Sequence, residues 1–232
     1  MITFLPVYIS IVFALTTFIT LILFHFAIKN SQASSKANMI TTGLLAWLVI
    51  QGLLTLNNFY NTDTNSFPPK FIILVFPALL TIGILFVSKK GRTFIDSLPL
   101  TNLTYLNIVR IPVELVLYWL FVNKAVPELM TFAGRNFDIL SGISAPIVAY
   151  FGLKQQKFSR KIILAWNFVA LGLLLNIVIN AVLSAPFAFQ KFAFEQPNIA
   201  VLNFPFSWLP AFIVPVVLFG HLASIRQLLR ST

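Results

Sequence analysis

The sequence predicts an all-α integral membrane protein, a single domain built as a bundle of seven transmembrane helices. Of the 232 residues, 58% are hydrophobic and only 9% are charged. A globular domain carries about 25% charged residues because most of its surface faces water. The apolar residues form seven long segments, and lysine and arginine concentrate in every second connection between them. Seven spans and short loops account for nearly all of residues 1–232, so we expect no separate soluble domain.

The predicted spans cover residues 2–28, 40–56, 71–88, 103–122, 137–153, 162–183 and 205–223. Each approaches the roughly 20 helical residues that cross a hydrocarbon core about 30 Å thick. The first segment lacks a basic n-region, and its apolar run exceeds the roughly 7–15 residues of a signal-peptide core. We therefore interpret it as a retained span. Prolines within the third, fourth, fifth and seventh spans predict kinks, because proline removes a helical hydrogen bond.

Basic residues predict the orientation of the bundle. One set of alternate connections holds eleven of them: Lys29, Lys36, Lys89, Lys90, Arg92, Lys154, Lys157, Arg160, Lys161, Arg226 and Arg230. The opposite set holds Lys70, Lys124, Arg135 and Lys191. Since cytoplasmic loops carry the excess of lysine and arginine, the richer side should face the cytoplasm. This places the N-terminus outside and the C-terminus inside, which requires an odd number of spans.

Two pairs of short matching peptides suggest an internal repeat. The tripeptide Leu-Ala-Trp occurs at 45–47 and at 164–166, and Pro-Ala occurs at 77–78 and at 210–211. Their positions are compatible with a parallel 3+1+3 repeat of helices 1–3 and 5–7. This layout resembles the plan of the sugar-transporting SWEET and PQ-loop proteins. None of the thirteen prolines is followed by glutamine, so the resemblance implies an arrangement of helices and no residue roles.

The fourth span contains the strongest candidates for a functional site, Asn107, Arg110, Glu114 and Tyr118. Charges at this depth are costly and usually functional. Arg110 and Glu114 are four residues apart, so they share a helix face and can pair. One interpretation is a ligand site in which Glu114 binds or titrates and Arg110 acts as a counter-ion or anion clamp. The alternative is a pair that neutralises itself while Arg110 extends toward the cytoplasmic headgroups.

Amides in neighbouring spans extend this candidate set. Asn176 and Asn180 stack on one face of the sixth span, and Gln51 lies in the second. They can bind a polar solute or join helices by hydrogen bonds. Asp138 begins the fifth span close to Arg135, which predicts either an outer vestibule or an ordinary ion pair at a helix end.

Metal and cofactor signals are weak. The chain has no cysteine, which excludes disulfides, thiolate metal sites and a cysteine nucleophile. His25 and His221 both lie near predicted cytoplasmic ends of spans, and they are weak candidates for a shared metal or haem site. The cofactor is unknown, and the chain carries no phosphate-binding or nucleophile-elbow motif.

These features favour a protein that binds or transports a small polar solute through a mid-membrane site. The alternative is a receptor, sensor or assembly subunit that acts through a protein partner. A membrane-embedded lipid enzyme is disfavoured, because the topology places Asp138 outside and His221 inside. We expect contacts with the bilayer and with anionic lipid at the cytoplasmic face. Nucleic acid is not expected as a partner, because the net charge of +10 is distributed as a topology signal. Short loops and the absence of cysteine suggest a bacterial inner membrane.

Overall fold

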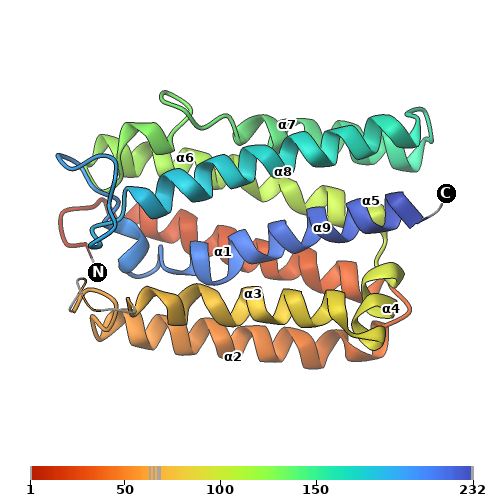
Figure 1. Ribbon diagram of the computed structural model, residues 1–232, viewed down its shortest axis with the longest axis horizontal. Helices are drawn as coiled ribbons and strands as arrows, with labels where there is room; N and C mark the ends of the chain where they lie inside the picture. Colours follow the sequence, from red (N-terminus) through yellow and green to blue (C-terminus); the bar gives the residue numbers. More distant parts are fainter. Residues whose placement is uncertain (1, 63, 65, 67–68, 231–232) are drawn as a thin grey trace.

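The computed structural model describes residues 2–62, 64, 66 and 69–230, and these ranges contain helices and no strand. The α-helices are α1 (Val7–Lys29), α2 (Ala37–Leu56), α3 (Phe71–Val87), α4 (Lys89–Ser97), α5 (Leu100–Tyr105), α6 (Arg110–Val122), α7 (Ile139–Ile147), α8 (Arg160–Leu183) and α9 (Val214–Arg230). Short 3-10 helices are η1 (Ser34–Lys36), η2 (Leu106–Val109), η3 (Glu128–Met130) and η5 (Ala200–Leu202). Two π-helices are η4 (Val148–Lys154) and η6 (Leu209–Ile213). The long helices run back and forth along the longest axis of the molecule (Figure 1).

Helix length confirms a bundle suited to a membrane. Within the described ranges, five helical runs are long and apolar enough to cross a bilayer: Val7–Lys29, Ser34–Leu56, Leu100–Val122, Arg160–Leu183 and Leu209–Arg230. The helices α3 and α4 together form a sixth candidate, bent by 94° at their junction. The apolar run Ile139–Lys154 is shorter. Seven spans, the orientation and the 3+1+3 repeat therefore stay predictions.

The last helix continues past residue 223, where the predicted apolar span ends. It continues to Arg230 because α4 provides polar partners for its final turns. Arg226 donates to Asp96 through Nε and Nη2, at 3.0 and 3.1 Å, and Arg230 also pairs with Asp96. Gln227 donates to the carbonyl oxygens of Ile95 and Leu98. The predicted span covers the apolar part of this helix, and the helix itself continues through a charged turn to Arg230.

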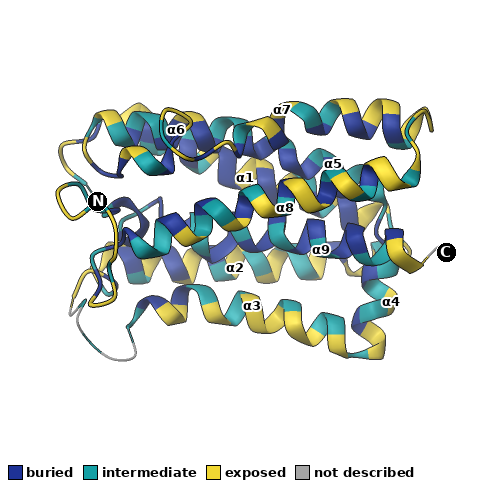
Figure 2. Ribbon diagram, turned by 45° about the horizontal axis from the view of Figure 1, so that its top comes forward, coloured by how far each residue is buried: buried dark blue, intermediate teal, exposed yellow. Residues whose placement is uncertain are grey.

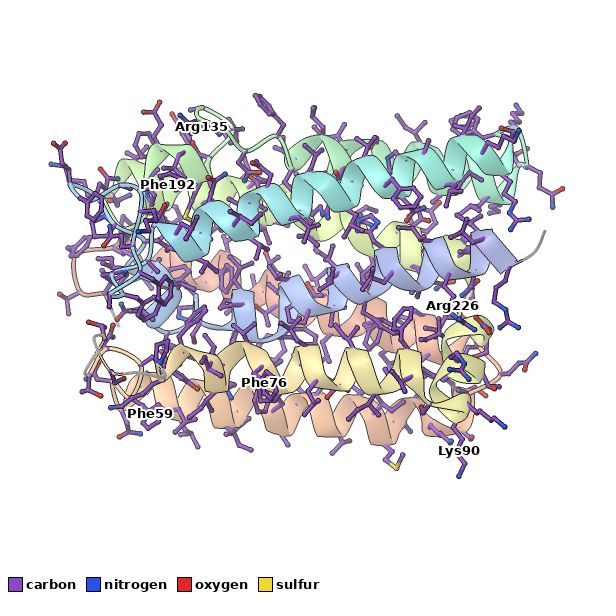
Figure 3. All side chains as sticks on the ribbon, in the orientation of Figure 1. Phe59, Phe76, Lys90, Arg135, Phe192 and Arg226 are labelled. Atoms are coloured by element: carbon purple, nitrogen blue, oxygen red, sulfur yellow. The ribbon has the colours of Figure 1, made fainter. Side chains whose placement is uncertain are left out.

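The two ends of the bundle differ in charge. The N-terminus and the C-terminus lie at opposite ends of the long axis (Figure 1). Lys90 and Arg226 lie at the end that carries the C-terminus, whereas Arg135 lies toward the other end (Figure 3). The order of the helices likewise brings the loops richer in basic residues to the C-terminal end.

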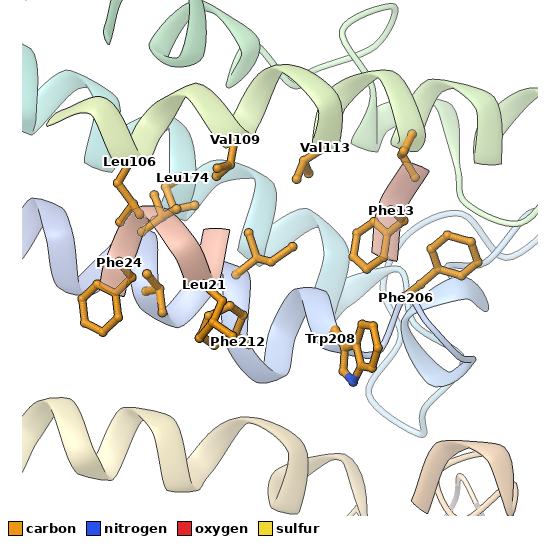
Figure 4. Close-up of a cluster of buried hydrophobic side chains, with 14 of the residues drawn as sticks. Phe13, Leu21, Phe24, Leu106, Val109, Val113, Leu174, Phe206, Trp208 and Phe212 are labelled. Carbon is orange, nitrogen blue, oxygen red and sulfur yellow. The ribbon is translucent and has the colours of Figure 1, made fainter. Parts of the chain in front are cut away.

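A large cluster of buried apolar side chains joins α1, α6 and α9 with the short helices η2 and η6. Phe13 and Leu21 of α1 belong to one buried cluster with Val109, Val113 and Phe212 (Figure 4). In a bilayer such packing is stabilised by van der Waals contact, because lipid tails are as apolar as the side chains. This cluster fixes α6 and α9 at the centre of the bundle.

The peripheral helices expose apolar surface. Only 22% of the α2 window is buried inside the protein, against 67% of the window that contains α9. Exposed residues mark the outer sides of α2 and α3 (Figure 2), and they include Val49, Leu53, Phe76 and Ile84. A large exposed apolar surface of this kind fits contact with lipid.

Helical irregularities occur next to prolines. The 3-10 helix η2 immediately precedes the start of α6, where Pro112 follows Arg110 by two residues. The π-helix η4 begins two residues after Pro146, and η6 contains Pro210. Proline at position i cannot donate to the carbonyl oxygen of residue i−4 and crowds it, so the hydrogen-bond pattern changes there. These breaks divide the helices that carry the polar residues described below.

The sharp bend between α3 and α4 depends on Gly91. A Cβ atom at this position would lie 2.3 Å from the backbone oxygen of Leu85. We expect Gly91→Ala to displace α4 and to lower the free energy of unfolding by about 1–3 kcal/mol. The matched control is Gly83→Ala in α3, where a Cβ atom would meet nothing within 4 Å. Denaturant titration in mixed micelles should show Gly83→Ala unchanged or more stable, and equal effects at the two positions would contradict the close approach.

Candidate polar site in the bundle interior

Arg110 is the centre of a buried polar cluster. Its side chain is 3% exposed and pairs with Asp138, with Nη1 3.1 Å from Oδ1. Nη1 and Nη2 donate to the carbonyl oxygen of Ala170 at 3.2 and 3.3 Å. Nη2 also lies 3.2 Å from Nε2 of His221. One guanidinium thus joins α6 to the start of α7, to α8 and to α9.

The partners of His221 indicate which ring nitrogen carries the proton. Nδ1 lies 3.0 Å from Oδ1 of Asn167, an oxygen that can only accept. Nδ1 therefore donates, and Nε2 accepts the hydrogen bond from Arg110. Asn167 in turn donates from Nδ2 to the carbonyl oxygen of Ile163 at 2.9 Å. The imidazole is held in one tautomer by a partner on each side.

Glu114 lies in the same region but has a different principal partner. Nδ2 of Asn136 lies 2.6 and 2.7 Å from its two carboxylate oxygens and 3.0 Å from the carbonyl oxygen of Met130. Oδ1 of Asn136 accepts from the backbone N–H of Asp138 at 3.0 Å. Asn136 is fully buried. Asn136 therefore links the carboxylate of Glu114 to Asp138, the residue that pairs with Arg110.

The cluster lies deep within the bundle. Arg110, Ala170 and His221 each occupy the middle of a helical run, namely Leu100–Val122, Arg160–Leu183 and Leu209–Arg230. A run of this length spans about 30 Å at 1.5 Å per residue. Partners that meet at the middle of three such helices are far from either end.

Several buried polar atoms of this region have no hydrogen-bond partner among the described residues. They are Oδ1 of Asn107, Nε of Arg110, Oδ1 of Asp138, which contacts Arg110 only as an ion pair, and Oγ of Ser141. Asn107 lies one turn before Arg110, and Ser141 lies one turn after Asp138. Unsatisfied buried polar atoms are rare and costly, so a cluster of them requires an explanation. The group combines hydrogen-bond donors with acceptors.

Three of the sequence-based interpretations need correction. Arg110 pairs with Asp138 rather than with Glu114, because α7 approaches α6 closely enough for the carboxylate of Asp138 to reach the guanidinium group. Asp138 consequently forms no ion pair with Arg135. His221 lies at the middle of its helical run, and Asp138 and His221 both contact Arg110. The separation that argued against a lipid enzyme therefore does not exist.

The remaining predicted site residues lie outside the direct contacts of Arg110. Tyr118 is half-buried and stacks on Phe132 with ring centroids 4.9 Å apart. Asn176 donates to the carbonyl oxygen of Arg135 at 2.9 Å and accepts from Asn180 at 3.2 Å. Asn176 thus ties α8 to the loop before α7, whereas Asn180 bonds to a residue of α8 itself. Neither of these two hydrogen bonds joins two helices, so the helix-joining alternative stays a prediction.

Gln51 and the two histidines also have separate partners. The hydroxyl of Tyr60 donates to Oε1 of Gln51, and burial raises the pKa of Tyr60 to about 12, although this hydrogen bond opposes the rise. Nδ1 of His25 lies 2.8 Å from Oγ1 of Thr41, whereas His221 belongs to the Arg110 cluster. Among the residues that the structure describes, no group of three or more histidine, cysteine or acidic side chains can hold a metal ion.

Sequence reasoning left Asn136 and Ser141 out of the candidate set. Asn136 precedes Asp138 by two residues in a predicted loop, and asparagine in this position often accepts from the backbone two residues on. That spacing was the available signal for Asn136. Ser141 follows Asp138 by one helical turn, which would have placed both side chains on one face.

Comparison with protein families gives a partial match. Residues 68–229 match the family described as a domain of unknown function, DUF8737. The chain belongs to this family. The matched range includes α3 to α9 and every residue of the Arg110 cluster, whereas α1 and most of the residues around Gln51 precede it. No curated protein and no solved structure matches the chain.

Proposed function

We propose that this chain is a membrane protein that binds or transports a small polar solute at the Arg110 cluster. The observation that carries the proposal is the ion pair Arg110–Asp138 in the middle of the bundle, where four buried polar atoms, two of them on the pair itself, have no hydrogen-bond partner in the part of the chain that the structure describes. A charge inside a membrane span is expensive and is functional by default. An ion pair with a purely structural role would gain no stability from neighbouring buried polar atoms that lack hydrogen-bond partners.

The chemistry of the cluster favours a solute with hydroxyl or amide groups. Nε of Arg110 and the hydroxyl of Ser141 can donate, and Oδ1 of Asn107 and of Asp138 can accept. Because Asp138 already compensates the charge of Arg110, the site has no large surplus of positive charge for an anion. A solute that carries both donors and acceptors matches these four atoms in chemical kind.

The irregular helices supply a means of opening this closely packed site. Asn107 lies in the 3-10 helix η2, and α7 continues into the π-helix η4. A Cβ atom on Gly142 would lie 2.9 Å from a side-chain carbon of Ile111 and 3.3 Å from Cβ of Arg110. The two helices therefore touch at the cluster, and rocking about the breaks would separate them. Transporters use discontinuous helices in this way.

The proposal includes a topology with seven spans, an external N-terminus and a cytoplasmic C-terminus, in a bacterial inner membrane. The support is the excess of lysine and arginine at the C-terminal end of the bundle. The termini at opposite ends of the long axis agree with an odd number of crossings (Figure 1).

A ligand screen by thermal shift tests the solute site. Purified full-length protein and the Glu114→Gln variant are screened against sugars, amino acids, nucleosides, organic anions and metal ions. A ligand at a hundredfold excess over Kd stabilises the folded state by about 2.7 kcal/mol. We expect a hydroxyl-rich or amide-bearing solute to raise the melting temperature of the wild type. Glu114→Gln should weaken or abolish this shift, because Glu114 holds Asn136, whose side chain accepts from the backbone of Asp138.

The matched control is Glu195→Gln, which changes an exposed glutamate and should keep the full shift. Uptake of the same solute into proteoliposomes then distinguishes transport from binding alone. A shift of equal size in wild type and in Glu114→Gln would contradict a site at the cluster. If no compound in the screen raised the melting temperature, the result would favour the receptor or assembly-subunit alternative.

A further inference from the structure

An apolar groove lies toward the C-terminal end of the bundle, and none of the residues that contact Arg110 lines it. This groove lies between α2, α3, α4 and α9 and has a volume of about 610 Å³. That volume is within the range of about 300–1,000 Å³ that is usual for ligand pockets. Apolar side chains dominate its walls, including Leu44, Ile82 and Phe212. The indole Nε1 of Trp47, also in the wall, donates to the carbonyl oxygen of Ala211 at 3.0 Å.

The groove has the depth of one bilayer leaflet. Along α3 its wall runs from Pro77 to Ser88, roughly 16 Å at 1.5 Å per helical residue. This is about half of a hydrocarbon core 30 Å thick. An acyl chain that enters from the C-terminal end would thus reach the deep end beside Trp47.

The mouth of the groove is positively charged. Lys36 and Lys90 both line it and are exposed. No ion pair links either lysine to a carboxylate of the described residues. The acid in the connections at this end is Asp96, and it is already bound by Arg226 and Arg230. Two lysines at the level where an apolar groove ends complement an anionic headgroup joined to an acyl chain.

We propose that this groove binds one anionic phospholipid from the adjoining leaflet, with its acyl chain along α3 and its headgroup between Lys36 and Lys90. The bend at Ser88, between α3 and α4, turns α4 across the end of α3 and brings Lys90 to the mouth of the groove. The site does not depend on the Arg110 cluster. Failure of one proposal therefore leaves the other intact.

The test uses Trp47 as a reporter inside the groove. Full-length protein in detergent is titrated with phosphatidylglycerol or phosphatidylcholine whose acyl chains carry bromine, which quenches tryptophan fluorescence on contact. The Trp47→Phe variant identifies the contribution of this residue. We expect Trp47 to be quenched at lower mole fractions of phosphatidylglycerol than of phosphatidylcholine.

The double variant Lys36→Gln/Lys90→Gln should reduce the preference for phosphatidylglycerol about thirtyfold, since each of the two lysines near an anionic lipid surface contributes about 1 kcal/mol and about 1.4 kcal/mol corresponds to a factor of ten. The control Lys29→Gln/Lys161→Gln removes two exposed lysines at the same end but outside the groove, and it should keep the preference. Lys36→Arg/Lys90→Arg retains both charges and should also keep it.

Three outcomes would overturn the lipid site. The first is equal quenching of Trp47 in the wild type by both lipids, which indicates ordinary bilayer contact. The second is the same preference for phosphatidylglycerol in the glutamine variant and in its control. The third is loss of the preference when inorganic phosphate alone is added at millimolar concentration, which indicates a site for the free anion. If the glutamine variant does not fold, loss of the preference in the arginine variant would also contradict the proposal.

Discussion

Arg110→Ala is expected to lower the free energy of unfolding by about 3–5 kcal/mol, the usual cost of removing one partner of a buried ion pair. The variant leaves Asp138 buried without its cation and removes the donors to Ala170 and His221. It should also abolish the solute-induced thermal shift while leaving membrane insertion intact. Denaturant titration in mixed micelles measures the stability, and membrane fractionation measures the insertion.

Two further variants separate charge from packing. Arg135→Ala removes an exposed arginine and should change the stability by less than about 0.5 kcal/mol. Arg110→Met/Asp138→Leu removes both charges and should recover most of the stability, because apolar replacement of a buried pair is often neutral or stabilising. It should not recover ligand binding. An Arg110→Ala protein as stable as Arg135→Ala would show that the ion pair is absent.

Asn136→Asp is expected to be the second most damaging substitution. It removes the amide that donates to Glu114 and to the carbonyl oxygen of Met130. It also places a second carboxyl group against that of Glu114. Two buried acids in contact, without the donor that satisfied one of them, should cost about 3 kcal/mol or more. The loss should appear as a lower denaturant midpoint.

The reciprocal exchange tests whether the contact itself is responsible. In Glu114→Gln/Asn136→Asp, the glutamine amide can donate to the new carboxylate, so we expect at least half of the lost stability to return. Asn38→Asp is the control, because Asn38 is exposed in the first turn of α2, where an acid is tolerated. A double variant no more stable than Asn136→Asp would contradict a direct contact between residues 114 and 136.

Much of the candidate site followed from single-helix arguments. The depth of Arg110 and Glu114 follows from their place in one long apolar run, and their common face follows from a spacing of four residues. The break near Pro112 follows from its missing N–H group. The choice of partner did not follow, since four-residue spacing favoured Glu114 and the structure pairs Arg110 with Asp138.

The position of His221 along its helix depends on where the helix ends, and the end of the predicted apolar span does not mark that point. The apolar span predicted from the sequence ends at residue 223, so His221 is predicted to lie near the cytoplasmic end of that span. In the structure, Asp96 and the carbonyl oxygens of α4 bind the charged and polar turn, so the helix extends to Arg230. His221 is thereby shifted to the middle of the helical run, beside Arg110 and Asn167.

The sequence by itself determined the helical class, the apolar runs that form the long helices and the concentration of basic residues in alternate connections. These properties depend on the environment of each helix, which composition and periodicity report directly. Only the tertiary structure decided which polar groups meet. Contacts between helices depend on their rotation and closest approach, which small residues such as Gly142 permit where α7 meets α6. No spacing along a single helix encodes that geometry, and therefore Asp138, Asn136 and His221 joined Arg110 only in the folded bundle.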